Sequence, residues 1–205
     1  MTLLSAPLRI WRDRVLKTLG TALLFAAGLA ITSDPAFAIQ TIVTQVDKNA
    51  DGSMTYHFAV KLDQGESLMP GASKEATADF VTVYNFYGMV DGSVKSPPGW
   101  EFSSEDFGRT PTLNGYPMVL PLDVPNTPNL TWTATKPVPA GAQIDGFVAT
   151  TRVGTIVQGQ YSAQVTRELP AIQVAGGGTP SAAAKTAKQA VIGALPTPSF
   201  LATVK

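Results

Sequence analysis

The sequence contains no cysteine and only one histidine, His57. The missing thiols exclude disulfide bonds, thiolate zinc sites and a cysteine nucleophile. A Ser-His-Asp triad would have to use His57, and no nucleophile-elbow glycine pattern accompanies it. A histidine-based zinc site would lack partners. Because His57 alternates with Thr55 and Lys61 on the polar side of an apolar pattern, we interpret it as a solvated strand residue.

Long hydrophobic runs are also missing. The uncharged stretch Leu19–Ile31 has 13 residues, short of the roughly 18 or more expected of a membrane-spanning helix. Basic residues precede it, and small residues follow it in Pro35-Ala36-Phe37-Ala38. This order predicts a signal peptide over residues 1–38, cleaved after Ala38. The alternative is an uncleaved membrane anchor. We expect an exported protein, periplasmic or extracellular.

Charge is sparse, at 15% of residues, and balanced over the whole chain. The predicted leader holds four of the 15 basic and two of the 15 acidic residues, which leaves 11 basic and 13 acidic residues after cleavage, a net charge of −2. Nucleic acid and anionic membrane surfaces need a clustered basic face. We find no such cluster, so we expect neither nucleic acid nor, after cleavage, a membrane as partner.

The body of the chain reads as strands. Met54–Asp63 alternates apolar and polar residues with period two, which indicates a half-buried strand. Phe80–Tyr87 has bulky residues on both sides, which favours a central strand covered on both faces. Further strands are expected at 41–46, 130–135, 144–153 and 155–167. This pattern predicts an all-β domain over residues 39–175, an antiparallel β-sandwich that is Ig-like in broad architecture.

The composition changes after Ala175. Gly176-Gly177-Gly178-Thr179-Pro180 has the composition of a flexible linker. Ser181–Leu195 is rich in alanine and lysine, but an isolated helix of this length is marginal in water, and Pro196 and Pro198 would end it. We therefore expect residues 176–205 to form a disordered or weakly helical C-terminal tail. It has no apolar run typical of a membrane anchor.

The segment Asp47–Ser53 resembles the start of a calcium loop. Asp47, Asn49 and Asp51 stand at positions 1, 3 and 5, with glycine at position 6. Position 12, which should be a bidentate glutamate, is Phe58. The segment therefore predicts at best a weak calcium site. The alternative is a polar hairpin turn, and we expect no other cofactor.

Three acidic residues, Glu101, Glu105 and Asp106, lie in an expected loop over residues 99–109. A pair of such carboxylates would be needed for glycosidase chemistry. Nothing in the sequence fixes their separation or buries one of them to raise its pKa. The alternative is that they are solvated loop acids.

Aromatic residues offer a different hypothesis, because exposed rings stack on sugars in carbohydrate-binding sandwiches. The candidates are Trp100, Tyr116 and Tyr87, since Trp132 and Tyr84 are expected to point inward. The alternative is that they pack in the core or under loops, because a sandwich without disulfides needs aromatic area.

A set of ordered motifs resembles a group of bacterial exported proteins. The motifs are Leu62-Asp63-Gln64-Gly65, the segment 80–86, Pro98-Gly99-Trp100, Pro128-Asn129-Leu130-Thr131-Trp132 and the segment 159–167, and they span most of residues 40–175. Proteins of this group are secreted and β-rich and often end in the PEP-CTERM sorting tail of exosortase systems. The resemblance implies no established activity and no catalytic residue. Leu195-Pro196-Thr197-Pro198-Ser199 echoes the Pro-Glu-Pro motif, without the spanning helix or arginine cluster that would follow it.

These observations lead to one hypothesis and two alternatives. We expect a non-enzymatic exported β-sandwich that serves as a structural or interaction module of the cell envelope or extracellular matrix, with proteins or polysaccharide as possible partners. The first alternative is a carbohydrate-binding module that uses loop aromatics. The second is a glycosidase-type hydrolase that uses loop carboxylates.

Overall fold

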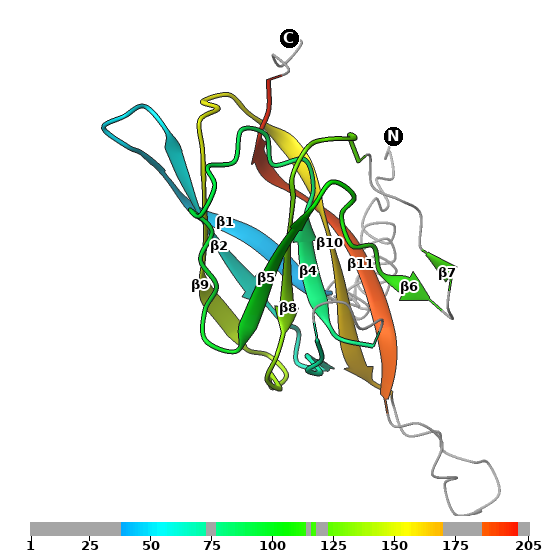
Figure 1. Ribbon diagram of the computed structural model, residues 1–205. Coiled ribbons are helices and arrows are strands. Elements are labelled where there is room, and N and C mark those ends of the chain that lie inside the picture. Colours follow the sequence, from blue (N-terminus) through cyan, green and yellow to red (C-terminus); the bar gives the residue numbers. More distant parts are fainter. Residues whose placement is uncertain (1–37, 73–76, 114–115, 118–122, 170–185, 201–205) are drawn as a thin grey trace, which may run out of the picture. The chain divides into compact units, whose positions relative to one another are not determined.

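The computed structural model describes residues 38–72, 77–113, 116–117, 123–169 and 186–200, all within a compact unit that covers residues 37–205 (Figure 1). The described residues contain strands, turns and loops and no helix. Nine of the eleven described strands form two antiparallel sheets that share one hydrophobic core. The prediction of an all-β, antiparallel β-sandwich is confirmed. Its Ig-like character stays a prediction.

The smaller sheet has three strands in the order β1-β2-β9. They are β1 (Gln40–Lys48), β2 (Met54–Lys61) and β9 (Gln143–Thr151). The alternation predicted for β2 is present, because Tyr56, Phe58 and Val60 are buried in the core. The register of β2 against β9 shifts between Phe58 and Ala59, where Gly146 is the extra residue in β9. Ala59, between the core residues Phe58 and Val60, is buried as well.

The larger sheet has the order β11-β10-β4-β8-β5, with β3 also paired to β10. Its strands are β3 (Glu66–Ser67), β4 (Phe80–Val83), β5 (Trp100–Glu105), β8 (Asn129–Ala134), β10 (Ile156–Glu168) and β11 (Thr186–Pro198). β4 lies at the centre of this order, and all four of its residues are buried. The prediction of a central strand covered on both faces is confirmed. A separate two-stranded ladder joins β6 (Thr112–Leu113) to β7 (Tyr116–Pro117).

Aromatic rings fill the space between the two sheets. Trp132 of β8 lies between Phe58 and Phe147 of the facing sheet, with ring centroids 5.8 and 5.4 Å apart. Phe86 meets Tyr56 edge-on at 5.4 Å. Such pairs add about 0.5–1.5 kcal/mol each beyond the area that they bury. In a chain without cysteine, this aromatic cluster takes the place of a disulfide in joining the sheets.

Two expectations about secondary structure are wrong. Residues 186–198 are not a disordered or helical tail but strand β11, which pairs with β10 along its whole length. Helix propensity is overridden here because β10 supplies a long hydrogen-bonding edge that the tail alone does not have. Residues 176–185 lie outside the described residues. The expected loop 99–109 contains edge strand β5, in which Trp100 and Phe102 pack against the core.

Candidate functional site

The outer face of the larger sheet carries a buried layer of polar side chains. The strands β4, β8 and β10 present their apolar residues to the core, so their alternate residues point to the other face. These residues are nearly all polar yet buried, and we call them the outer polar layer: Thr82, Tyr84, Thr131, Thr133, Ser162, Gln164 and Thr166. The Tyr84 hydroxyl donates to Arg109 O (2.8 Å) and bonds with Ser162 Oγ (2.8 Å). The chain around Gly108 lies so close that a Cβ there would contact Thr82 and the Tyr84 ring. The layer is therefore roofed by the chain that follows β5.

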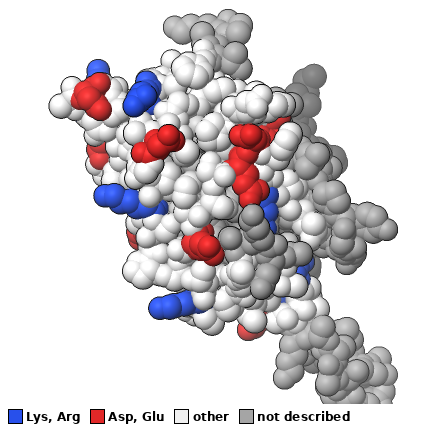
Figure 2. Space-filling view, viewed as in Figure 1, with Lys and Arg blue, Asp and Glu red and all other residues white. Residues whose placement is uncertain are grey.

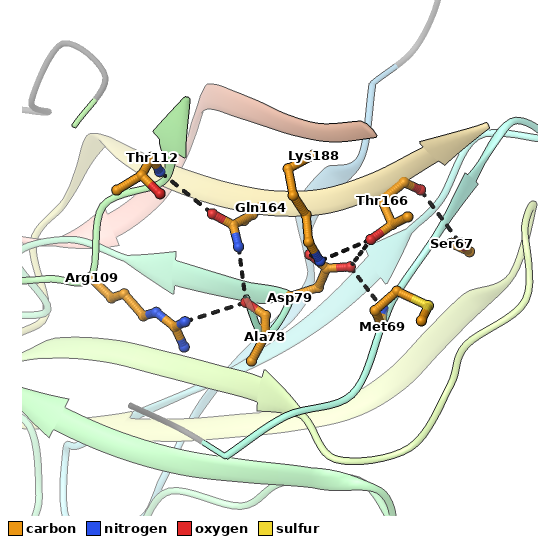
Figure 3. A network of polar contacts seen from close by, with 9 residues as sticks. All are labelled: Ser67, Met69, Ala78, Asp79, Arg109, Thr112, Gln164, Thr166 and Lys188. Carbon is orange, nitrogen blue, oxygen red and sulfur yellow. Dashed lines mark hydrogen bonds and ion pairs between the residues drawn. The ribbon is translucent and has the colours of Figure 1, made fainter. Parts of the chain in front are cut away.

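An ion pair lies at one end of this layer (Figure 3). Lys188 Nζ of β11 is 2.6 Å from Asp79 Oδ1, just before β4. The Asp79 side chain is fully buried, and its Oδ2 accepts from Met69 N (2.7 Å) and Thr166 Oγ1 (2.8 Å). Burial raises the pKa of Asp79 above its ordinary value, although the bonds from Lys188, Met69 and Thr166 oppose the rise. Both oxygens of the Asp79 carboxylate therefore accept hydrogen bonds.

Arg109 extends the polar cluster toward the middle of the sheet. Its guanidinium lies 4.1 Å from the centre of the Phe80 ring, a cation–π contact. It donates to Thr133 Oγ1 (3.3 Å) and to Ala78 O (3.3 Å). Gln164 Nε2 donates to the same carbonyl at 3.1 Å (Figure 3). Burial lowers the pKa of Arg109 from its ordinary value, with Glu105 and Asp79 acting in the opposite direction.

The chemistry open to this cluster is limited by how its groups are used. Lys188 donates to Asp79 and to Thr166 Oγ1 (2.9 Å), so the ammonium bridges β11, β10 and the start of β4. Within the described ranges, no three acidic, histidine or cysteine side chains gather closely enough to hold a metal ion. The arrangement fastens strands to one another.

The three residues of the predicted calcium loop make bonds within their own hairpin. Asp47 Oδ2 is 3.0 Å from His57 Nε2. Asn49 Nδ2 donates to Ser53 Oγ and Thr55 Oγ1, both at 2.9 Å. Asp51 Oδ1 accepts from Ser53 N (3.0 Å) and Ser53 Oγ (2.6 Å), and these bonds lower the pKa of Asp51. These contacts are those of a tight turn between β1 and β2; a weak calcium site there stays a prediction.

The predicted carboxylate and aromatic sites are not assembled among the described side chains. Glu101, Glu105 and Asp106 are all exposed, on or just after edge strand β5. Trp100 is 8% exposed and meets Phe147 edge-on at 4.9 Å in the core, so expecting it on an exposed platform was wrong. Tyr87 is half-buried, and its ring meets that of Phe200 edge-to-face, with the centroids 5.6 Å apart and the planes at 78°. The side chain of Tyr116 lies outside the described residues.

The ion pair was missed by sequence reasoning. Lys188 lay in a segment expected to be a tail, and Asp79 lay just outside a predicted strand. One signal was available, because threonine and glutamine alternate with core residues in segments 130–135 and 161–166. Polar residues on one face of a central strand indicate that another segment packs over that face. Here Arg109 belongs to the segment that packs over it, and Lys188 reaches it from strand β11.

The surface in view in Figure 2 carries its acidic and basic side chains in scattered positions, without a continuous basic area over the described part of that face. In the part of the chain that the structure describes, no helix has the length and apolarity to cross a membrane. No family model, curated protein or solved structure matches this chain.

Proposed function

We propose that this chain is an exported, non-enzymatic β-sandwich that acts as a structural or interaction module of the cell envelope or extracellular matrix. The observation that carries the proposal is the use of its buried charges. Asp79 and Lys188 fix the C-terminal strand to the sheet, and Arg109 fixes the chain that covers the outer polar layer. These contacts of Asp79, Lys188 and Arg109 support a cohesive role for the cluster.

The N-terminal sequence supports the exported part of the proposal. The boundary of the compact unit, between residues 36 and 37, lies two residues before the expected cleavage after Ala38.

The C-terminal segment Leu195–Ser199, which echoes the Pro-Glu-Pro motif, belongs to or adjoins β11. Leu195, Thr197 and Ser199 are buried. In the folded protein this segment therefore acts as part of the sheet.

Export is tested by expressing the full chain in a bacterial host and fractionating the cells. We expect protein outside the cytoplasm whose intact mass corresponds to a chain beginning at Ile39. An uncleaved chain that stays in the cytoplasm would contradict the proposal. A charge placed in the apolar stretch, Leu24→Arg, is the control and should retain the chain inside.

The structural role is tested by binding and turnover on the same exported protein. We expect a thermal-shift screen to give a raised melting temperature with envelope polysaccharide or an envelope protein, because a ligand of the native state stabilises it by mass action. We expect no hydrolysis of glycosidic substrates. Turnover that survives purification and is lost in Glu101→Gln or Glu105→Gln would establish the hydrolase alternative instead.

A further inference from the structure

Glu66 is a buried carboxylate that is short of hydrogen-bond donors. It opens the short strand β3 and is 0% exposed. Its Oε2 accepts from the Asp63 main-chain N–H at 3.2 Å. Its Oε1 has no hydrogen-bond partner among the described residues. A buried carboxylate usually has several donors or a paired cation, because the desolvation of the charge is costly.

The main-chain nitrogen of Ile39 faces this carboxylate. Its N–H acts on Glu66 and lowers the pKa of the carboxyl group, yet it does not complete a hydrogen bond to Oε1. Ile39 is 0% exposed, and its carbonyl accepts from the Tyr161 hydroxyl at 3.1 Å. The carbonyl of Ile39 is therefore held by Tyr161, and its nitrogen lies near a carboxylate that forms no ion pair among the described residues.

Ile39 is also the residue that becomes the N-terminus if the signal peptide is removed after Ala38. Hydrolysis of the Ala38–Ile39 bond adds one water across it, leaving a carboxylate on Ala38 and an amine on Ile39. That amine takes a proton at neutral pH, since an unperturbed α-amino group has a pKa of about 7.7–8.0. The neutral donor that faces Glu66 is thereby replaced by a cation with three N–H groups.

We propose that the new α-ammonium group of Ile39 forms a buried ion pair with Glu66, so that removal of residues 1–38 completes the fold. The inference rests on the proposed export and cleavage. Ala38 is only half-buried and lies at a hollow of about 350 Å³. The hollow is lined by Ala38, Gln40, Lys61, Leu62, Asp63, Gln64 and Gly141. The hollow thus borders Ala38, the residue that leaves on cleavage, and Asp63, whose main-chain N–H donates to Glu66.

The charges around Glu66 determine the pH dependence. Burial raises the pKa of Glu66, nearby Asp63 raises it further, and Arg167 lowers it. Tyr161 carries no charge near pH 7, since the ordinary pKa of a tyrosine hydroxyl is about 10, and burial raises its pKa further. Before cleavage the folded pKa of Glu66 is above the unfolded value, so the stability of the chain falls as the pH rises through that folded pKa.

After cleavage the direction changes. The ammonium lowers the pKa of Glu66, and Glu66 in turn raises the pKa of the α-amino group above 7.7–8.0. A raised folded pKa means that this stabilisation is fully present below about pH 7.7 and is lost as the pH rises through the folded value. The contribution of this pair to stability should therefore be flat through pH 5–7 and be lost only in the alkaline range.

The test uses one molecule before and after cleavage. In the full chain, residues 33–38 are replaced by the recognition sequence of a protease that cuts directly before Ile39. We expect cleavage to raise the melting temperature at pH 7 by about 4 °C or more, since 1 kcal/mol shifts Tm by about 2–4 °C at this size. In Glu66→Gln, cleavage should leave it within about 1 °C. An equal shift in both proteins, or none in either, would overturn the proposal.

A second measurement covers the case in which Glu66→Gln fails to fold. An amine-specific reagent should modify the Ile39 α-amino group of the cleaved native protein at least tenfold more slowly than after unfolding in urea. Equal rates would show a free terminus and overturn the pairing. The natural cleavage site is checked separately by the intact mass of the exported chain. A mass that excludes Ile39 as the first residue contradicts the proposed processing, whereas the protease experiment still tests the pairing.

Discussion

Asp79 and Lys188 lie 109 positions apart in the sequence, and their side chains meet at 2.6 Å. The Asp79 side chain is fully buried and that of Lys188 is 32% exposed, so the lysine covers the carboxylate from the solvent side. A pair of this kind adds little net stability over an apolar replacement, but removing one partner leaves a buried charge unpaired. The ion pair instead fixes the position of β11, because the strand must lie where the Lys188 ammonium group reaches Asp79.

Lys188→Met should destabilise the fold by about 2–4 kcal/mol at pH 7, somewhat below the usual cost of breaking a buried pair because Lys188 is partly exposed. The Asp79 carboxylate then remains buried without its cation. The double variant Asp79→Asn/Lys188→Met is the matched control and should recover much of the loss. Urea unfolding measures the free energy for each protein. Equal losses in the single and double variants would show that the ion pair does not couple.

The same variant should change how stability depends on pH. The pKa of Asp79 is already raised by burial, and loss of the ammonium raises it further. A raised folded pKa gives stability below the unfolded value, near 3.9, that is lost as the pH rises through the folded pKa. Lys188→Met should thus approach wild type near pH 4 and fall below it toward pH 7. When Lys188→Met is introduced into an Asp79→Asn background instead, the difference in melting temperature that it causes should no longer widen from pH 4 to pH 7. A difference that stays constant with pH in the wild-type background would show that Asp79 is not the titrating group.

Gly193→Ala tests whether β11 packs on β10 in the observed register. Gly193 is opposite Tyr161, and a Cβ there would overlap the tyrosine ring. We expect a loss of about 1–3 kcal/mol, as for other overpacked sites. Gly154→Ala is the control, since nothing lies within 4 Å of its Cβ position, and it should be nearly neutral. If the two variants unfold at the same urea concentration, β11 does not lie as described.

Sequence patterns predicted a strand correctly where residues within that strand determine its burial. The alternation of Tyr56, Phe58 and Val60 predicts a strand because one face of a sheet is buried whatever its partner. For Phe80–Tyr87, bulky residues on both sides predicted cover on both faces. The identity of that cover was not predictable, because it comes from residues after β5 that have no periodic pattern of their own.

The C-terminal strand and the ion pair were not predictable for a different reason. Strand β11 is rich in alanine and contains Gly193, Pro196 and Pro198 around Leu195, so its local propensity favours no strand. It is a strand because β10 offers thirteen paired positions. Lys188 in turn has meaning only once that register brings it beside Asp79. The contact joins residues too distant in sequence for any local pattern to connect them.

Trp100→Ala should cost about 3 kcal/mol or more, as large-to-small core substitutions do. The side chain is buried against Phe147, which in turn meets Trp132, so its removal opens a cavity between the sheets. Trp100→Phe keeps an edge for Phe147 and should cost clearly less. Thermal unfolding followed by far-UV circular dichroism measures both. A fully stable Trp100→Ala that has lost binding to a polysaccharide would instead support the carbohydrate-binding alternative.

Calcium at millimolar concentration should change the melting temperature of the protein by no more than about 1 °C. A site that bound calcium tightly would give a much larger rise, because a ligand present at 100 times its Kd stabilises the native state by about 2.7 kcal/mol. The oxygens that would bind the ion already have partners: Asp47 holds His57 at 3.0 Å, and Asp51 Oδ1 accepts two bonds from Ser53. Asp51→Ala should lower the melting temperature equally with and without calcium, because it removes turn bonds and not a ligand. A calcium-dependent rise that disappears in Asp51→Ala would show that the hairpin opens to bind the ion. Magnesium is the matched control, since its stricter octahedral geometry suits this turn even less.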